Sequence, residues 1–576
     1  MSKVTALHTT VHESASTTRR GLIGSAIAAA VGTPERTARK PAAAPPTTSS
    51  APPKKRAIAS RPYANGGPVD RDQSMAETVG TGATSVPTGA QYATYSAAAR
   101  AAKPAPSALF DVTDIHAHLL RRATFGARAS DVSALKKLGV EKWLTKQLAP
   151  HSFSDTSGDA AWKAFPLAGA TPATIHKKVT KYGWDAMYAT AQATLGRQIF
   201  SNRQLYEIVI DIFTAHLHVA VPGEQWDTSP GYIVNVIRKY SFGKFSDMLL
   251  HAMKHPAMLS FLGNDQSYKA HVNENLGREL LELHTVGVAS GYTENDVKAS
   301  AAILSGRTID YPTGAYHYDA TRHETGPVTV LGFSAANATG AGGEKVGDDY
   351  LRYLAHHPGT ARNIARKIAT RFVSDEPSDD LLDRLVAVYL KHDTSILEVV
   401  KAVFRSSDFW SVVGIRMRRP LEDAVGTVRV LGISRPSTAA KTAKGITSIY
   451  WALVTAGNAP LGWNPPNGYP DVAAAWLGAG TMIQSWNLHR AVIYGWWGGF
   501  AFANPMKFVT ITKGMTAGKW MSAVAQKLLG TAPTPDHLAA MLAGMGLTAT
   551  SGPPGWEYQA GEGMALALDS AYFQLR

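Results

Sequence analysis

The stretch "NENLGRELLELHTVGV" (residues 273–288) carries leucine at the spacing of an α-helix. Leu276, Leu280 and Leu283 fall on one side of such a helix, and this apolar side would face a core. Similar stripes recur along the chain, as in "NRQLYEIVIDIFTAHLHV" (202–219), whereas runs that alternate between apolar and polar residues are scarce. The sequence therefore predicts a mainly α fold.

The same helix carries a polar stripe beside its leucines. Arg278, Glu279 and Glu282 form this stripe, and two carboxylates at positions i and i+3 can reach a common point. In a catalytic interpretation, one glutamate is a general base or a ligand of a divalent metal, and the arginine stabilises negative charge. His216 or His323 would complete the site. The alternative is an Arg–carboxylate network that holds helices together, with His216 as a core histidine bonded to a backbone carbonyl.

The composition sets limits on partners and chemistry. The chain has 576 residues, of which 45% are hydrophobic, and this is enough for a large core. It contains no cysteine, so disulfides, thiolate metal sites and cysteine nucleophiles are excluded. Residues 1–107 hold 13 Lys and Arg against 5 Asp and Glu, so this region carries +8 of the formal charge of +14. We find no nucleic-acid-binding motif and expect no nucleic acid partner.

Residues 1–32 resemble a twin-arginine export signal. Arg19 and Arg20 precede an apolar stretch, residues 21–32, that is too short to span a bilayer. The alternative is a basic tail that happens to contain two arginines. Residues 33–107 are rich in Ala, Pro and Ser without apolar periodicity, which predicts a disordered linker. We expect an exported protein, periplasmic or extracellular, with no transmembrane span.

Residues 108–576 are expected to form a single large helical domain. Within it, residues 306–346 lack helical periodicity and predict a long irregular insertion with at most a short β-hairpin. The best strand candidate in this insertion is "GPVTVLGF" (326–333). The glycine-rich run "GAGGEKVG" (340–347) predicts a loop.

A second cluster of candidate residues lies in "HHPGTARNIARKIATR" (356–371). Arg362 and Arg366 are one helical turn apart, and Lys367 and Arg371 form a second such pair. Four cations on one helix can bind phosphate, sulfate or uronate groups, with Arg362 and Arg366 as substrate-binding candidates. The alternative is a helix face that is solvated or paired with carboxylates.

A third cluster lies in "NAPLGWNPPNGYPDVAAAWL" (458–477), where prolines and glycines predict a loop. Trp463 and Trp476 offer flat apolar faces next to the amides of Asn464 and Asn467, and a carbohydrate-binding groove uses such groups for stacking and hydrogen bonds. The alternative is a long loop that its own tryptophans hold onto the helices.

Taken together and in order, these stretches resemble the bacterial family catalogued as domain of unknown function 1800. The motifs that carry the resemblance are "HLLRRATFGAR" (118–128), "HPAMLSFL" (255–262), and residues 273–307, 356–373 and 458–477. The resemblance implies one large, helical, exported domain, but no reaction. Family members often occur beside a sulfatase-like or phosphatase-like protein, which implies a partner enzyme.

The chain departs from the family pattern at two places. Where the family usually has Asn-His-Phe, this chain has Ala215, His216 and Leu217, and where it usually has His-Asp, this chain has His323 and Glu324.

Two hypotheses for function follow, and whether the protein is an enzyme stays open. The first is a hydrolase that acts on an envelope or extracellular polymer through Glu279, Glu282 and Arg278, with His216 or His323. The second is a non-catalytic protein that binds glycan or docks a partner enzyme through the loop at 458–477. No Gly-Lys-Ser/Thr phosphate loop, Gly-x-Ser-x-Gly elbow or His-Glu-x-x-His motif occurs, which disfavours nucleotide-driven and serine-hydrolase chemistry.

Overall fold

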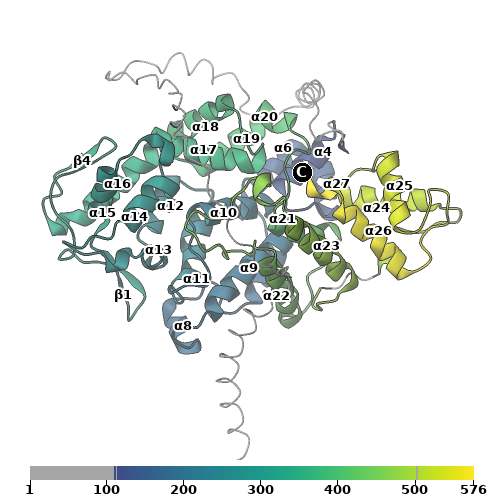
Figure 1. The fold of residues 1–576 in the computed structure, drawn as a ribbon, viewed down its shortest axis with the longest axis horizontal. Coiled ribbons are helices and arrows are strands. Elements are labelled where there is room, and N and C mark those ends of the chain that lie inside the picture. The colour runs from purple at the N-terminus through teal and green to yellow at the C-terminus, as the bar shows by residue number, and fades with distance from the viewer. Residues whose placement is uncertain (1–108, 112, 501, 503) are drawn as a thin grey trace, which may run out of the picture. The chain divides into compact units, whose positions relative to one another are not determined.

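The computed structural model describes residues 109–576, except 112, 501 and 503 (Figure 1). These residues are mainly helical, so the predicted fold class is confirmed. The predicted export signal (1–32) and linker (33–107) lie outside the described residues. Export and the domain boundaries therefore stay predictions.

The helices fall into three successive groups along the chain. The first group is α4 (Ile115–Ala123), α5 (Ala129–Leu138), α6 (Val140–Gln147), α7 (Thr156–Lys163), α8 (Pro172–Lys178), α9 (Asp185–Phe200), α10 (Gln204–His216) and α11 (Ser229–Tyr232). The second group is α12 (Phe245–Ala252), α13 (Pro256–Phe261), α14 (Asn275–Glu279), α15 (Glu294–Leu304), α16 (Gly340–His356), α17 (Pro358–Phe372), α18 (Asp379–Lys391), α19 (Ile396–Arg405) and α20 (Ser407–Ser411). The third group is α21 (Pro420–Val430), α22 (Ala439–Thr455), α23 (Ala479–Tyr494), α24 (Ala517–Leu529), α25 (Pro535–Gly544), α26 (Glu557–Asp569) and α27 (Ala571–Gln574).

Shorter helical turns join these elements. Two of them are π-helical, namely η3 (Ile233–Arg238) and η5 (Leu280–His284). The others are 3₁₀ turns, namely η2 (Pro150–Ser152), η4 (Asn264–Gln266), η6 (Val288–Ser290), η7 (Ala473–Ala475) and η8 (Pro505–Lys507).

Side-chain caps fix where several helices begin. Helix α15 starts with a reciprocal pair, in which the amide of Thr293 donates to Asp296 (2.7 Å) and the amide of Asp296 donates to the Thr293 hydroxyl (3.2 Å). Helix α17 starts at Pro358, and the amide of Gly359 donates to Nδ1 of His357 (3.0 Å).

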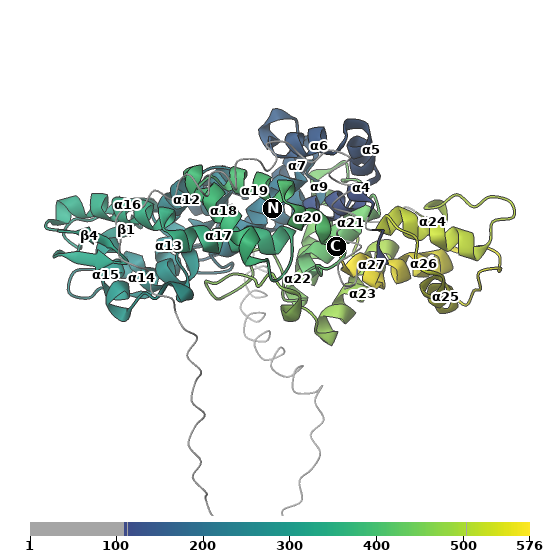
Figure 2. The same ribbon diagram turned by 90° about the horizontal axis from the view of Figure 1, so that it is seen from above.

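The apolar stripes meet in one continuous core. Helix α9 packs against α7, α21 and α22, and its Leu195 and Ile199 are fully buried. Helix α17 packs against α10, α18 and α19, and α18 and α19 lie alongside it in Figure 1. Full burial of one such leucine or isoleucine contributes about 1.5–3 kcal/mol. Towards the C-terminus, α24, α25 and α26 pack on one another (Figure 2).

The leucine-rich stretch at 273–288 differs in detail from the regular helix that its spacing predicts. Helix α14 ends at Glu279, and the chain continues as the π-helical turn η5. A π-helix has i→i+5 hydrogen bonds, so its wider turn changes which side chains share a face. Leu276, Leu280 and Leu281 are therefore buried, whereas Leu283 stays partly exposed.

The predicted irregular insertion contains two β-hairpins rather than at most one. Strand β1 (Arg307–Asp310) pairs antiparallel with β2 (Ala315–Tyr318), so that Arg307 lies opposite Tyr318. Strand β3 (Val328–Val330) pairs with β4 (Phe333–Ala335), and both lie within or next to the strand candidate at 326–333. Backbone pairing gives each short strand its regular shape, and burial alternates along β2, β3 and β4 but not along β1.

The loop predicted at 340–347 is wrong, because these residues form the first two turns of α16. The Thr339 hydroxyl caps the helix by accepting from the amide of Gly342 (3.2 Å). Glycine is needed at 343 because a Cβ there would overlap the His323 ring and the Tyr318 hydroxyl. Close packing against the β1–β2 hairpin, and not a turn, explains this glycine.

No helix in the described part of the chain is both long enough and apolar enough to cross a bilayer. This agrees with the expectation of no helical span among these residues.

Candidate functional site

The polar stripe of the 273–288 stretch makes contacts other than those expected. Arg278 forms a two-pronged ion pair with Glu294 of α15 (2.8 and 2.7 Å) and a longer contact with Glu274 (3.4 Å), instead of pairing with Glu279 or Glu282. The pair with Glu294 ties α14 to α15 at the surface, where such pairs contribute at most about 1 kcal/mol.

The two glutamates of the stripe remain partly exposed. Glu282 accepts a hydrogen bond from the Tyr292 hydroxyl (3.2 Å). Burial and the like charge of Glu282 raise the pKa of Glu279, and Arg278 only partly opposes this shift. A carboxyl with a raised pKa takes up a proton more readily, but this geometry alone assigns it no substrate.

His216 is a buried residue that bonds to backbone. Its Nε2 lies 3.0 Å from the carbonyl oxygen of His284, and Nδ1 of His284 lies 2.9 Å from the carbonyl oxygen of His216. Burial, followed by the charge of Lys367, lowers the pKa of His216 well below its usual value, so the ring is neutral. These contacts agree with the interpretation of His216 as a core histidine.

His323 lies in the insertion, and its hydrogen bonds are separate from those of His216 and of the polar stripe. Its Nδ1 faces the Ser305 carbonyl (2.9 Å) and its Nε2 faces the amide oxygen of Asn337 (2.7 Å). The neighbouring Glu324 accepts from the amide of Ala270 (2.9 Å). Within the described ranges, no hydrogen bond or ion pair joins His323 to His216 or to the polar stripe.

The predicted catalytic residues are thus distributed over three sets of contacts, and their catalytic roles stay predictions. No group of three or more His, Asp and Glu side chains is arranged to hold a metal ion in the part of the chain that the structure describes.

The cations of α17 divide into paired and unpaired side chains. Arg362 forms ion pairs with Asp379 (2.6 Å) and Asp383 (2.5 Å) of α18. Arg371 is buried and pairs with Asp211 (2.8 Å) and Asp471 (2.5 Å). By contrast, the side chains of Arg366 and Lys367 form no hydrogen bond or ion pair with any described residue.

The third cluster forms a loop that is held partly by its own tryptophans. The indole N–H of Trp463 donates to Asn467 (2.8 Å), and the indole N–H of the buried Trp476 donates to the Pro470 carbonyl (3.0 Å). Asn464 is exposed, and its side chain makes no hydrogen bond to the described residues. Trp476 therefore has a structural contact, while the Trp463 ring stays partly exposed.

The second and third candidate stretches and the end of α10 line one cavity of about 350 Å³, which we call the Lys367 cavity, whereas no residue of 273–288 lines it. Its polar and aromatic lining residues are His216, Asn363, Arg366, Lys367, Thr370, Arg371, Arg419, Trp463, Asn467, Tyr469 and Asp471. Helices α10 and α17 and the loop at 463–472 supply most of these residues, with Arg419 from the segment before α21. Six residues singled out in the sequence therefore meet at one place, namely His216, Arg366, Lys367, Arg371, Trp463 and Asn467.

Hydrogen bonds hold the loop at 458–477, which we call the tryptophan loop, against the end of α10. The amide of Val221 donates to the Leu461 carbonyl (2.8 Å), and His218 bonds through Nε2 to the Trp463 carbonyl. The Tyr469 hydroxyl donates to the Ala459 carbonyl (2.9 Å) within the loop. These contacts place Trp463 and Tyr469, whose ring centroids are 5.1 Å apart, at the cavity wall.

An ion network forms one side of the Lys367 cavity. Asp471 accepts from Arg371 (2.5 Å) and from Arg416 (2.6 Å), and Asp211 accepts from Arg419 (2.5 Å). Burial opposes ionisation of Asp471, but these arginines outweigh it and hold its pKa well below the usual value. The arginines at this side of the cavity are therefore already neutralised by carboxylates.

Lys367 differs from these arginines. Burial lowers the pKa of Lys367, and the more distant charge of Asp471 only partly offsets the effect. Lys367 is half-buried, so its ammonium has lost part of its hydration without gaining a partner, and an anion that reaches it would relieve that cost. The sequence identified Lys367 only as one cation among four, because a helical pattern does not show which cations have partners.

Comparison with known proteins identifies the family of this chain and nothing more specific. No curated protein sequence and no solved structure matches this chain. The family described as "Protein of unknown function (DUF1800)" matches residues 118–575. This range includes every residue of the Lys367 cavity. Because the match covers most of the chain, in agreement with the five ordered motifs, the protein belongs to the DUF1800 family.

Proposed function

We propose that the protein binds an acidic sugar unit of an envelope or extracellular polymer in the Lys367 cavity. The observation that carries the proposal is the ammonium group of Lys367, which lines the cavity and has no carboxylate partner among the described residues. Arg366 is exposed at the same cavity and is likewise unpaired within the described ranges. Two cations are thus free to bind one carboxylate or sulfate group.

The remaining lining residues favour a sugar ring over a small inorganic anion. Trp463 and Tyr469 present aromatic surface, on which the apolar face of a sugar ring packs. Asn363 and Asn467 add amide groups for hydroxyl hydrogen bonds, although each already makes one contact, to Thr285 and to Trp463. A volume of about 350 Å³ lies within the range of small-ligand sites.

This proposal joins two of the predictions from sequence, the acidic-group site on α17 and the glycan site in the tryptophan loop. The catalytic hypothesis has less support, because its carboxylates and histidines take part in separate contacts. We also propose that the protein is exported through the twin-arginine-like signal at 1–32, which would bring it to such a polymer. Docking of a partner enzyme stays a prediction.

Binding of trigalacturonate to the full chain, measured by calorimetry, tests the proposal. Lys367→Met should weaken binding about 10-fold or more, since a charge-assisted hydrogen bond contributes about 1.5–3 kcal/mol. Binding to the unchanged protein should also weaken with added salt. It should be lost on raising the pH sooner than for an ordinary lysine, because burial lowers the pKa of Lys367.

The matched control is Arg362→Met, which removes a cation one turn from Arg366 that already pairs with Asp379 and Asp383. This variant should bind trigalacturonate within about 2-fold of the unchanged protein. Inorganic phosphate and neutral galactotriose, used as competitors, show whether both charge and ring are needed. Equal loss of affinity in the two variants, or equal competition by phosphate, would contradict a sugar-acid site at Lys367.

A further inference from the structure

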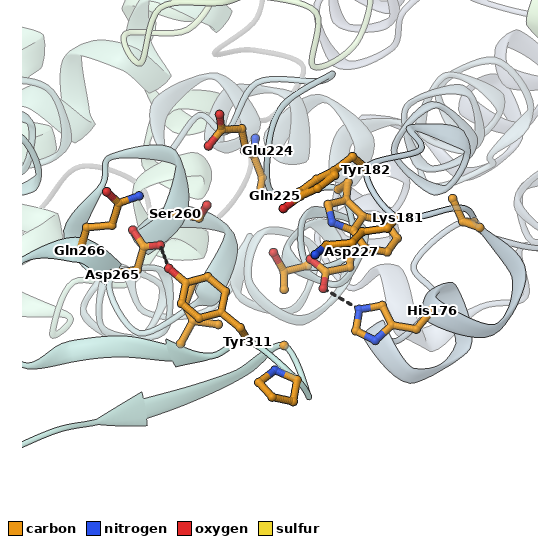
Figure 3. A pocket seen from close by; sticks show the side chains of 16 residues that line it. His176, Lys181, Tyr182, Glu224, Gln225, Asp227, Ser260, Asp265, Gln266 and Tyr311 are labelled. Carbon is orange, nitrogen blue, oxygen red and sulfur yellow. Dashed lines mark hydrogen bonds and ion pairs between the residues drawn. The ribbon is translucent and has the colours of Figure 1, made fainter. Parts of the chain in front are cut away.

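A second and larger cavity, of about 590 Å³, lies away from the residues singled out in the sequence. We call it the Tyr311 cavity. It lies between the end of α8, the segment at 224–228, the turn η4 after α13, and the tip of the β1–β2 hairpin (Figure 3). No residue of the Lys367 cavity lines it.

Two hydrogen-bonded pairs face each other across the Tyr311 cavity. On one side, the Tyr311 hydroxyl donates to Oδ2 of Asp265 (2.6 Å). On the other side, Nε2 of His176 lies 2.8 Å from Oδ2 of Asp227. Figure 3 shows the two pairs on opposite sides, with Tyr311 at the end of the hairpin. Each pair fixes the position of one carboxylate.

Asp265 fixes Tyr311 from inside the cavity wall. It is almost fully buried (3% exposed), and its Oδ1 is enclosed by protein. Burial raises the pKa of Asp265, and hydrogen bonds from Tyr311 and from the backbone of residues 265 and 266 oppose the rise. The pair therefore positions the Tyr311 ring, while the accessible polar groups of the cavity belong to other side chains.

The hairpin tip is seated firmly, so this side of the cavity is preformed. Gly314 has a left-handed backbone conformation (φ +65°), and a Cβ there would lie 2.9 Å from Pro172 of α8 and 3.3 Å from Thr228. The amide of Gly314 also donates to the Asp310 carbonyl (2.8 Å) and closes the turn. Such close packing holds Tyr311 near Asp265.

Aromatic rings give the cavity flat walls. Tyr182 and Tyr311 are 62% and 61% exposed, which is unusual for large aromatic side chains. The buried Trp226 supports the His176 ring at 5.3 Å. The Lys181 ammonium lies over the Tyr182 ring at 5.1 Å, so one ring face is already covered by a cation. Tyr311 is therefore the ring open to a ligand.

The charges of the cavity favour a neutral ligand. Glu224, Asp227 and Asp265 would repel an anion, while Lys181 would repel a cation. The side chains of Glu224, Ser260 and Gln266 also line the cavity and make no hydrogen bonds to described residues. This mixture of unused donors and acceptors fits hydroxyl groups, because each hydroxyl both donates and accepts.

We propose that the Tyr311 cavity binds a neutral pyranose unit, which packs on the Tyr311 ring and forms hydroxyl hydrogen bonds with the exposed side chains of Glu224 and Gln266. The inference concerns a different cavity from the acidic-sugar site and does not depend on it. Two separate sites on one chain would allow the protein to contact a polymer, or two polymers, at acidic and neutral units.

Titration of the full chain with a panel of neutral oligosaccharides of two to four pyranose units tests the proposal. Calorimetry reports binding, with the total tryptophan fluorescence of the chain as a second readout. Tyr311→Leu should weaken binding of the best oligosaccharide about 10-fold, because it removes the stacking surface. Tyr311→Phe keeps the ring and loses the hydrogen bond to Asp265, so it should retain most of the affinity.

Two further variants distinguish binding in the Tyr311 cavity from binding elsewhere on the chain. Trp451→Leu removes a 46% exposed aromatic outside the cavity and should leave binding unchanged. Lys367→Met should also leave neutral-sugar binding unchanged, even if trigalacturonate binding fails altogether. Melting temperatures show that each variant is folded. Absence of binding by every oligosaccharide of the panel, or equal binding by Tyr311→Leu, would overturn the proposal.

Discussion

At the scale of single residues, the partner of a charged side chain decides what that side chain can do. Arg362 and Arg366 have the same chemistry and lie one turn apart on α17. Arg362 is neutralised by two aspartates of α18, whereas Arg366 lies at the Lys367 cavity without a partner among the described residues. A ligand anion would compete with no carboxylate at Arg366, so we expect Arg366, and not Arg362, to take part in anion binding.

Stability should depend on pH through His489. Burial lowers the pKa of His489, but Asp423 (3.1 Å) and Asp569 (2.7 Å) outweigh burial and raise it to about 9. The folded state thus binds this proton more tightly than the unfolded state, in which the pKa is about 6.5. The stabilisation of about 3 kcal/mol is complete below pH ~6.5 and is lost as the pH rises through ~9.

Urea unfolding at pH 6, 7.5 and 9 measures this effect as a fall in the free energy of unfolding. The variant His489→Gln should show a flatter dependence over the same range, because it lacks the proton that the folded state holds. His392→Gln is the control, since His392 is exposed and its side chain has no polar contact among the described residues. An equally steep fall in His489→Gln would assign the pH dependence to other groups.

At the scale of elements, packing can reverse what local propensity predicts. Alanine is a better helix former than glycine by about 1 kcal/mol, so Gly→Ala inside a helix is often stabilising. At Gly343 of α16, however, a Cβ would overlap the His323 ring, and His323 is held by Ser305 and Asn337. Gly343→Ala should therefore destabilise the protein by about 1–3 kcal/mol through overpacking.

The same substitution in another helix is the control. Gly480 of α23 has no atom within 4 Å of an added Cβ, so Gly480→Ala should be neutral or slightly stabilising. Melting temperatures of the two variants test the difference. If both variants were stabilised, the contact between α16 and the β1–β2 hairpin would be looser than the structure shows.

Elements also differ in how far the sequence predicts them. Periodicity identifies the helices with long apolar stripes, such as α10 and α17, because i, i+3 and i+4 spacing is a local property. It misses the π-helical turn η5, and it misses the start of α16 because the glycine-rich run has too few apolar residues to show a helical period. Short hairpins such as β1–β2 have too few residues for a period-2 pattern.

At the scale of the whole molecule, buried ion pairs join segments that are far apart in the sequence. Glu422 accepts from Arg576 (2.5 Å), and the backbone amide of Arg576 donates to the Arg416 carbonyl (2.8 Å). Burial raises the pKa of Glu422, but Arg576 and other arginines outweigh it and lower the pKa to about 2. The tail of the chain thereby becomes part of the network beside the Lys367 cavity.

Export of the protein is testable through the predicted signal at residues 1–32. Replacing Arg19 and Arg20 together with lysine should block export, because the paired arginines are the feature by which the signal resembles a twin-arginine leader. Cell fractionation with detection of the full chain measures the outcome. Arg36→Lys with Arg39→Lys, in the predicted linker, preserves charge in the same way and should leave export intact. Unchanged export of the Arg19/Arg20 variant would contradict the prediction.

The sequence by itself determined the helical class and the family, and it identified six of the sixteen residues that line the Lys367 cavity. Apolar periodicity and ordered motifs are properties of neighbouring residues, so they are visible without the fold. Only the tertiary structure decided which charges are paired, that His216, Arg366 and Trp463 line one cavity, and that Tyr311 and Asp265 form another. Ion pairing and cavity formation depend on distances between segments that lie up to hundreds of residues apart, and no local pattern encodes those distances.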